Sequence, residues 1–330
     1  MAVSGASGLI GRHIVSVLLA LSRAYKLNLK VIAIARDQKK LEHAFVAFQD
    51  EPSLVLRPCD IAQAGSWPTE ATHFVHAASP ATPLLFATQP TSVILANVLG
   101  TLHALQTAVD SGAYVLFLSS SESYGVVGEH ELTADGLISE SSLGLINPLD
   151  VRSAYPESKR MSETLVIAYA AQFGVRGDIV RVSHTYGPGV ADDDNRVQVQ
   201  FAKQAAAGET IAIKSDGRLM RHYTYAADCA AAVLRVLETN RQRNQPEAFN
   251  VADASVFISI RELAEQMLIA AGRPESDLVV GQPAAESAGW SKVTGGALDT
   301  KKIEGLGWNP QFILAEGLSR MIASMRADQD

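Results

Sequence analysis

The chain contains only two cysteines, Cys59 and Cys229, and their positions do not have the spacing of metal ligands. We expect both to be buried as small apolar side chains. No segment is expected to be apolar for long enough to span a bilayer, and the start of the chain is not the charged region of a signal peptide. The formal net charge of -7 comes without a basic cluster, which argues against a nucleic-acid partner. These absences predict a soluble, cytoplasmic protein.

Apolar segments alternate with helical patterns along the 330 residues, of which 47% are hydrophobic and 19% charged. This composition can bury a large core, and the alternation predicts an α/β fold with a doubly wound parallel sheet of the Rossmann type. Strands are expected near residues 29–35, 54–57, 73–76, 114–118 and 177–182, and helices near 10–25, 91–110 and 154–173. The sequence predicts a main domain over 1–185 and 221–254, and a smaller mixed α/β lobe over 186–220 and 255–330.

The first motif is a glycine string, Gly5, Gly8 and Gly11, between a short apolar start and a helical pattern. Such a strand, turn and helix let backbone N–H groups approach a pyrophosphate, and the last glycine lets the helix lie close to the sheet. A tight turn without a ligand is the alternative. Only residues 1–4 precede the string, so the first strand should be shorter than usual.

Tyr155 and Lys159 are spaced to lie one turn apart on the same face of a helix. A free phenol has a pKa of about 10, and a nearby ammonium lowers it, so the two residues are a candidate proton-abstracting couple. Two solvated side chains are the alternative. Ser153 is a plausible cap for this helix, and Gly174 should end it. Its predicted apolar stripe consists of Met161, Leu165, Ala168 and Gln172.

A hydroxyl-rich segment, residues 119–125, follows the apolar run at 114–118. The run predicts a buried parallel strand, and ligands bind at the carboxyl ends of such strands. Ser121 is therefore placed to hydrogen-bond a substrate hydroxyl and the phenol of Tyr155. The alternative is a polar turn that caps the strand.

Together these motifs resemble the extended short-chain dehydrogenase/reductase family, in its NAD-dependent nucleotide-sugar branch of epimerases, dehydratases and decarboxylases. The resemblance covers nearly the whole chain. Further matches, in chain order, are residues 59–61, 76–79, 97–101, 181–188, 216–217, 221–223, 228 and 249–251. The resemblance implies that Tyr155 takes a proton from a sugar hydroxyl, most often at C4. Lys159 would hold the cofactor ribose and keep the phenol acidic, and a 4-keto sugar would result.

The same resemblance implies three sets of site residues. The catalytic set is Tyr155, Lys159, Ser121, Glu122 and Arg221. The cofactor-binding set is Gly5, Ser7, Gly8, Leu9, Ile10, Gly11, Arg36, Asp60, Ile61, Ala77, Ala78, Asn97, Ser119, Tyr155 and Lys159. The set that binds the nucleotide sugar is Pro80, Ser121, Glu122, His184, Arg196 and Arg221, with the smaller lobe as the nucleotide-sugar-binding part. No metal is expected, and the run Asp192–Asp194 is predicted to be a solvated loop.

Ser121 and Glu122 stand where the dehydratases of this family carry an adjacent Asp-Glu pair. A Ser-Glu pair looks like UDP-glucuronate decarboxylases, as does the loop 78–83, and Arg221 aligns with the arginine that they place beside the sugar carboxylate. His184 departs from the Asn of those enzymes. Decarboxylation and epimerisation of the keto sugar both stay open. A 4,6-dehydratase, a carbonyl reductase and a non-catalytic NAD(P)-sensing protein are further alternatives.

The second predicted strand ends at Ala35, Arg36 and Asp37, without an acidic residue in the position that usually binds the adenosine ribose of NAD. Relatives of this branch generally use NAD, which is therefore the expected cofactor. NADP is possible because Arg36 could hold its 2′-phosphate. The family also implies a homodimer that forms through the helices near 91–110 and 154–173.

Overall fold

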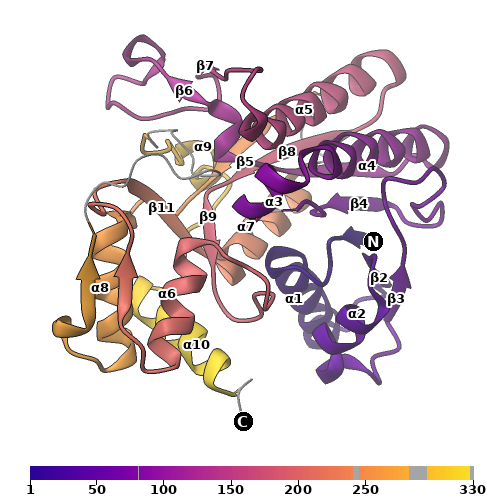
Figure 1. Cartoon of the computed structure of the whole chain (residues 1–330). Helices are drawn as coiled ribbons and strands as arrows, with labels where there is room; N and C mark the ends of the chain where they lie inside the picture. The colour runs from indigo at the N-terminus through magenta and orange to yellow at the C-terminus, as the bar shows by residue number, and fades with distance from the viewer. Residues whose placement is uncertain (81, 241–244, 282–295, 328–330) are drawn as a thin grey trace.

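The computed structural model describes residues 1–80, 82–240, 245–281 and 296–327. Its centre is a seven-stranded sheet in which all neighbouring strands are parallel (Figure 1). In spatial order the strands are β3 (Leu54–Pro58), β2 (Val31–Ala35), β1 (Ala2–Ser4), β4 (His73–His76), β5 (Tyr114–Ser120), β8 (Gly177–Val182) and β12 (Ala248–Val251). The direction of winding reverses between β1 and β4, which confirms the doubly wound Rossmann-type sheet.

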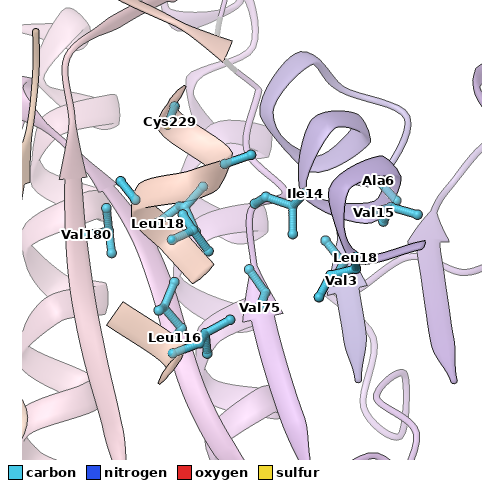
Figure 2. Close-up of a cluster of buried hydrophobic side chains, with 14 of the residues drawn as sticks. Val3, Ala6, Ile14, Val15, Leu18, Val75, Leu116, Leu118, Val180 and Cys229 are labelled. Carbon is cyan, nitrogen blue, oxygen red and sulfur yellow. The ribbon is translucent and has the colours of Figure 1, made fainter. Parts of the chain in front are cut away.

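Helices cover both faces of this sheet (Figure 1). Helices α1 (Leu9–Tyr25) and α7 (Ala226–Thr239) pack on one face, and α4 (Pro90–Ser111) and α5 (Ala154–Phe173) pack on the other. Figure 2 shows Ile14 of α1 and Cys229 of α7 among the apolar side chains of the strands. Cys229 is fully buried, as expected, but Cys59 is only partly buried because it follows β3 at the edge of the sheet.

A smaller lobe has its own apolar core beside the central sheet (Figure 1). Its three-stranded sheet has the order β13 (Phe257–Ser259), β11 (Met220–Tyr225), β9 (His184–Tyr186), and β10 (Ile211–Ile213) pairs with β14 (Leu278–Val280). The helices that pack with these strands are α6 (Val197–Ala206), α8 (Ile260–Ala271) and α10 (Leu314–Ala327). Strand β9 follows β8 directly, so the chain passes from the main sheet to the lobe within two residues.

Shorter elements lie between these strands and helices. These are α2 (Gln38–Ala44), α3 (Pro83–Thr88), α9 (Lys301–Glu304), the hairpin β6 (Val126–Val127) and β7 (Gly144–Leu145), and the 3₁₀ turns η1 (Val46–Phe48), η2 (Ser121–Tyr124), η3 (Glu129–Glu131), η4 (Val151–Ser153) and η6 (Glu275–Asp277). Turn η2 follows β5, and η4 leads into α5. Both turns therefore carry residues to the carboxyl edge of the sheet.

The bounds of α5 are as predicted, but its buried face is not. Met161 is 51% exposed, and Ala168 and Gln172 are also exposed. The buried face instead consists of Tyr155, Pro156, Ser158, Lys159, Ser162, Glu163 and Val166. Small and polar side chains line it because α5 packs closely on α4, and apolarity alone did not identify this face.

The ends of α5 agree only in part with the prediction. Gly174 ends the helix with a φ of 70°, a left-handed conformation that glycine adopts without strain. Ser153 stands at the cap position, but its hydroxyl donates to the Asn147 carbonyl at 2.6 Å instead of accepting from a helix N–H. The side chain therefore fixes the turn before the helix.

Helix α4 is long and apolar enough to cross a membrane by length and composition alone, contrary to the sequence expectation. In the structure it packs against α5. The Asn97 amide donates to Ser158 Oγ at 2.9 Å, and Ser162 Oγ donates to the Asn97 carbonyl at 3.1 Å. A core helix of a soluble protein passes the same test, so one such helix is weak evidence for a membrane span.

Candidate active site

The glycine string forms a tight cradle between β1 and α1. Gly5 has a φ of 67°, and a Cβ atom there would lie 2.7 Å from the backbone of Ala78. A Cβ on Gly11 would lie 2.2 Å from the Gly5 carbonyl oxygen, so the helix could not keep its distance to the turn. Gly8 stands exposed at the amino end of α1 without a side-chain cap. Open N–H groups at this end fit the pyrophosphate of a dinucleotide.

Hydrogen bonds tie the cradle to β4. The Ala78 N–H donates to Ser4 Oγ at 3.2 Å, and Ser4 Oγ lies 2.8 Å from His76 Nδ1. Burial lowers the pKa of His76 to about 3, and nearby Lys159 lowers it further, so the imidazole is neutral. The predicted cofactor residues Ala77 and Ala78 are thus held beside the glycine turn.

Ser7 lies in the glycine turn, and Leu9 and Ile10 begin α1. The predicted cofactor residues outside this segment, β4 and α5 divide into two groups. Arg36 and Asp60 follow β2 and β3 at the carboxyl edge of the sheet, where Asp60 Oδ1 accepts from the Ala62 N–H at 3.0 Å. The remaining three side chains are engaged inside the fold. Ile61 is buried in the core, Asn97 bonds Ser158, and the Ser119 hydroxyl donates to Glu163 Oε1 at 2.5 Å.

Tyr155 lies in the first turn of α5 and is buried. Its ring stacks on Phe86 of α3, with 4.4 Å between the ring centroids and 17° between the ring planes. Burial raises the pKa of Tyr155 to about 12, and the charge of Glu122 adds to the rise. A hydrogen bond from Ser120, together with the charges of Arg152 and Arg196, opposes it. The phenol therefore holds its proton at neutral pH.

Lys159 lies one turn further along α5, and its predicted effect on the Tyr155 phenol stays a prediction. Its ammonium donates to the Leu118 carbonyl at 2.7 Å and lies 5.8 Å from the centroid of the Tyr155 ring. Burial lowers the pKa of Lys159 itself to about 7, against the opposing effect of Glu163. The charges that favour the phenolate are those of arginines, whose tertiary positions the spacing in the sequence did not reveal.

Ser120 is the hydroxyl that sequence reasoning missed. Strand β5 runs two residues beyond its predicted end, to Ser120, so Ser119 and Ser120 point to opposite faces. The first bonds Glu163, whereas the second bonds the phenol of Tyr155. Ser121, the predicted partner, lies in turn η2. Extending the strand through the serines would have identified the correct one.

A small cavity of about 40 Å³ lies between the main sheet and the smaller lobe. Four predicted residues line it, namely Ser121, Glu122, His184 and Arg221, together with Tyr124, Gly125, Ile138, Ser183, His222, Phe257, Gly296 and Leu298. They come from η2, β9 and β11, so the fold brings together residues that are a hundred positions apart in the chain. The cavity is therefore lined both by the turn that follows β5 and by strands of the lobe.

Guanidinium groups surround this cavity. Arg152 Nη2 lies 2.6 Å from Glu122 Oε2, and the Arg152 guanidinium lies over the Phe86 ring at 4.6 Å. Burial lowers the pKa of His184 to about 3, and the charges of Arg221, Arg196 and Arg152 contribute, so His184 is neutral. Such a group of cations favours an anionic substrate. Arg152 and Phe86 were not predicted, because only the fold brings them to Tyr155.

Arg196 is engaged with the acidic run that was expected to be solvated. Its guanidinium binds Asp194, with 2.6 Å between Nη2 and Oδ2, and Asp194 is buried, although Asp192 and Asp193 are exposed. The solvated-loop prediction was therefore wrong for Asp194. Within the described part of the chain, no cluster of three or more His, Cys, Asp or Glu residues could hold a metal ion.

Pro80 lies in the partly buried loop between β4 and α3, where the Ser79 hydroxyl donates to its carbonyl at 3.3 Å. Residue 81, in the middle of the predicted substrate loop 78–83, lies outside the described residues. The structure thus places Pro80 on the segment that carries Phe86 to Tyr155.

The sheet, the glycine cradle and the buried tyrosine define a dinucleotide-binding α/β enzyme. The family model described as "NAD dependent epimerase/dehydratase family" matches residues 1–252, and the chain belongs to this family.

Curated relatives carry one recurring name. The chain is 34% identical over 259 residues to UDP-glucuronic acid decarboxylase 6 of Arabidopsis thaliana, which covers 78% of this chain and 70% of that protein. It is 30% identical over 260 residues to UDP-glucuronic acid decarboxylase 1 of Xenopus tropicalis, over 78% of this chain and 58% of that one.

Among solved structures, the dTDP-glucose 4,6-dehydratase DesIV of Streptomyces venezuelae, with NAD and TYD bound, has a TM-score of 0.81 and 25% identity. The match covers 99% of this chain and 97% of that one. The UDP-glucuronic acid 4-epimerase of Bacillus cereus has a TM-score of 0.80 at 20% identity, over 99% and 98% of the two chains, and shares the fold.

Proposed function

We propose that the protein binds a nucleotide sugar and a dinucleotide of the NAD type, and that it oxidises the sugar at C4. The observation that carries this proposal is the buried phenol of Tyr155 at the carboxyl edge of the sheet, where Ser120, Arg152 and Arg196 each act to lower its pKa. Glu122, whose charge also acts on this phenol, lines the cavity at the same edge of the sheet as the glycine cradle. The relatives named above act on nucleotide sugars by their names, which supports the substrate class.

In this reaction the proton of the C4 hydroxyl goes to the Tyr155 oxygen, and Ser120 holds the reacting hydroxyl in line. When bound, the dinucleotide supplies a nicotinamide ring that accepts the C4 hydrogen as hydride. The phenol must first lose its own proton. Positive charges favour that loss, and Arg152 and Arg196 provide such charges in this chain.

We further propose that the 4-keto sugar loses its C6 carboxylate as carbon dioxide. A uronic acid that is oxidised at C4 is a β-keto acid, and its bond to the carboxylate breaks once the developing enolate is stabilised. The electron pair of that bond forms the enolate, C5 then takes up a proton, and C4 takes back the hydride from the reduced nicotinamide, so the net change is the loss of carbon dioxide. Arg221 lines the cavity and provides a cation for an anionic sugar, whereas Arg152 is paired with Glu122. Ser121 stands where a dehydratase would need an acid to protonate a leaving hydroxyl, and a serine hydroxyl is too weak an acid for that step.

The test is to incubate the purified protein and a dinucleotide with UDP-glucuronate, and then with a panel of UDP-, dTDP-, GDP- and CDP-sugars, and to resolve the products by mass. A loss of carbon dioxide from the uronate is expected. A loss of water would show dehydration in place of decarboxylation, and an isomer of unchanged mass would show 4-epimerisation. Net consumption of reduced cofactor with a carbonyl substrate would identify a reductase. No turnover of any sugar would favour a cofactor-sensing protein.

Ser120→Ala is expected to lower turnover by about 10- to 100-fold, because it removes a hydrogen bond to the reacting phenol. Ser121→Ala and Ser119→Ala are the matched controls, since each removes a neighbouring hydroxyl that does not bond the phenol. Steady-state kinetics of the three variants show which serine hydroxyl contributes to turnover. A larger loss in Ser121→Ala than in Ser120→Ala would restore the assignment made from the sequence.

A homodimer is part of this proposal. Apolar side chains are exposed on both helices that the family resemblance implicates, with Ile94 and Leu95 on α4 and Met161 and Ile167 on α5. Such a surface is a candidate interface. Sedimentation of the purified protein as a monomer at micromolar concentration would contradict it.

A further inference from the structure

We propose that the carboxyl end of β2 is a binding site for the 2′-phosphate of NADP, so that the protein binds NADP more tightly than NAD. This inference rests on the proposed dinucleotide site and names the group that its adenosine end accepts. The description of the matched family and the DesIV structure both name NAD, which has no 2′-phosphate, so the proposed preference departs from these relatives.

The end of β2 lies beside the glycine cradle. Ser4 of β1 pairs with Ile34 of β2, and the Ala6 N–H still donates to the Ile34 carbonyl at 3.1 Å inside the turn. Arg36 follows two residues later. In this class of fold the adenosine ribose lies at the end of the second strand, so a side chain at position 36 lies near the ribose hydroxyls.

The carboxylate that selects NAD is missing from this place. A dinucleotide site for NAD has an acidic side chain at the end of β2, which bonds the ribose 2′-hydroxyl and repels a 2′-phosphate. This chain has Ala35 there. The next acid, Asp37, is already engaged, because its Oδ1 accepts from the Lys40 N–H at 3.1 Å at the start of α2.

Arg36 supplies the opposite charge. Its side chain is exposed, and within residues 1–80, 82–240, 245–281 and 296–327 no carboxylate forms an ion pair with it. Lys39 and Lys40 are exposed in the next turn, and Lys40 Nζ lies 3.9 Å from Asp193 Oδ2, a weak contact at the surface. Three cations and one engaged carboxylate therefore lie within five residues. A guanidinium binds a phosphate through two parallel hydrogen bonds, which makes Arg36 the expected anchor.

The experiment measures binding, not turnover. Purified wild-type protein is titrated by calorimetry with NADP and NAD, and with adenosine 2′,5′-bisphosphate and AMP as probes of the adenosine end alone. NADP is expected to bind more tightly than NAD, and adenosine 2′,5′-bisphosphate more tightly than AMP. Arg36→Gln should weaken NADP binding by about 10- to 100-fold, as expected for lost hydrogen bonds to a charged group, and leave NAD within about threefold.

Two further variants complete the test. Lys30→Gln is the matched control, because it removes an exposed cation just before β2, at the opposite edge of the sheet, and should change neither affinity. Ala35→Asp should install the missing carboxylate and reverse the preference toward NAD. Wild-type protein that prefers NAD, or NADP binding that survives Arg36→Gln, would overturn the 2′-phosphate site. If neither dinucleotide binds, the proposed dinucleotide site fails together with it.

Discussion

Tyr155→Phe is expected to lower turnover by about 10² to 10⁴-fold, the usual contribution of a positioned acid–base group, and to leave the fold intact. The substitution removes only the oxygen that Ser120 bonds, while the ring can keep its stacking on Phe86. Tyr169→Phe is the matched control on the same helix, because the Tyr169 ring contacts the tilted ring of Phe173 far along α5. Steady-state measurements of turnover for both variants test this expectation, and circular dichroism verifies that both variants fold.

The pH profile provides a second readout for Tyr155. Burial raises the pKa of its phenol to about 12, so the small phenolate fraction of the free enzyme grows with every unit of pH through the neutral range. The kcat/KM of the wild type should therefore rise from pH 6 to pH 9, and that rise should be absent from the residual activity of Tyr155→Phe. A flat wild-type profile, or a variant with wild-type turnover, would remove Tyr155 from the reaction.

Lys159→Met is expected to stabilise the fold below neutral pH while it lowers turnover. The folded protein holds the pKa of Lys159 at about 7, whereas the unfolded chain keeps the ordinary lysine value of 10.5. Between these two values the unfolded chain binds more protons, so this residue makes stability increase with pH. The destabilisation that Lys159 causes is therefore fully present below pH 7 and disappears as the pH rises past 10.5. Removal of the ammonium should raise the free energy of unfolding at pH 6.5 by on the order of a few kcal/mol.

Urea denaturation of wild type and variant at pH values from 6.5 to 10 measures this difference. The gain in stability should shrink as the pH rises, because the folded lysine is then neutral and the lysine of the unfolded chain approaches its own pKa of 10.5. Lys30→Met is the control, since Lys30 is exposed and its loss should give no such trend. A stability difference between the two proteins that is independent of pH would show that burial of the Lys159 ammonium does not destabilise the fold.

The sequence predicted those elements that are marked by local patterns of apolar residues and by clear end signals. Strands β4 and β8 and helix α5 have the expected bounds, because each is an apolar or helical run with clear ends, such as Gly174 after α5. The Rossmann order followed from the glycine string and from the alternation of strands and helices. The candidate roles of Tyr155 and Lys159 came from spacing and resemblance.

What the sequence did not predict depends on tertiary contacts. The buried face of α5 is polar because Ser158 and Ser162 meet Asn97 of α4, and no apolar period marks such a face. The partner of Lys159 is a backbone carbonyl of β5, which carries no signature in the sequence. Arg152 and Phe86 reach Tyr155 only after separate segments have folded together.

The alternation of Ser119 and Ser120 along β5 limits how this protein can change. The two hydroxyls are one peptide unit apart, yet one belongs to the buried network of Glu163 and the other meets Tyr155. A slip of one residue in the strand would exchange them and misplace both at once. An insertion or deletion within β5 should therefore abolish activity, because it misplaces both hydroxyls. The turn that begins at Ser121 has no strand register to keep, but it carries Glu122, whose charge raises the pKa of Tyr155, so substitutions there act on the oxidation step through charge.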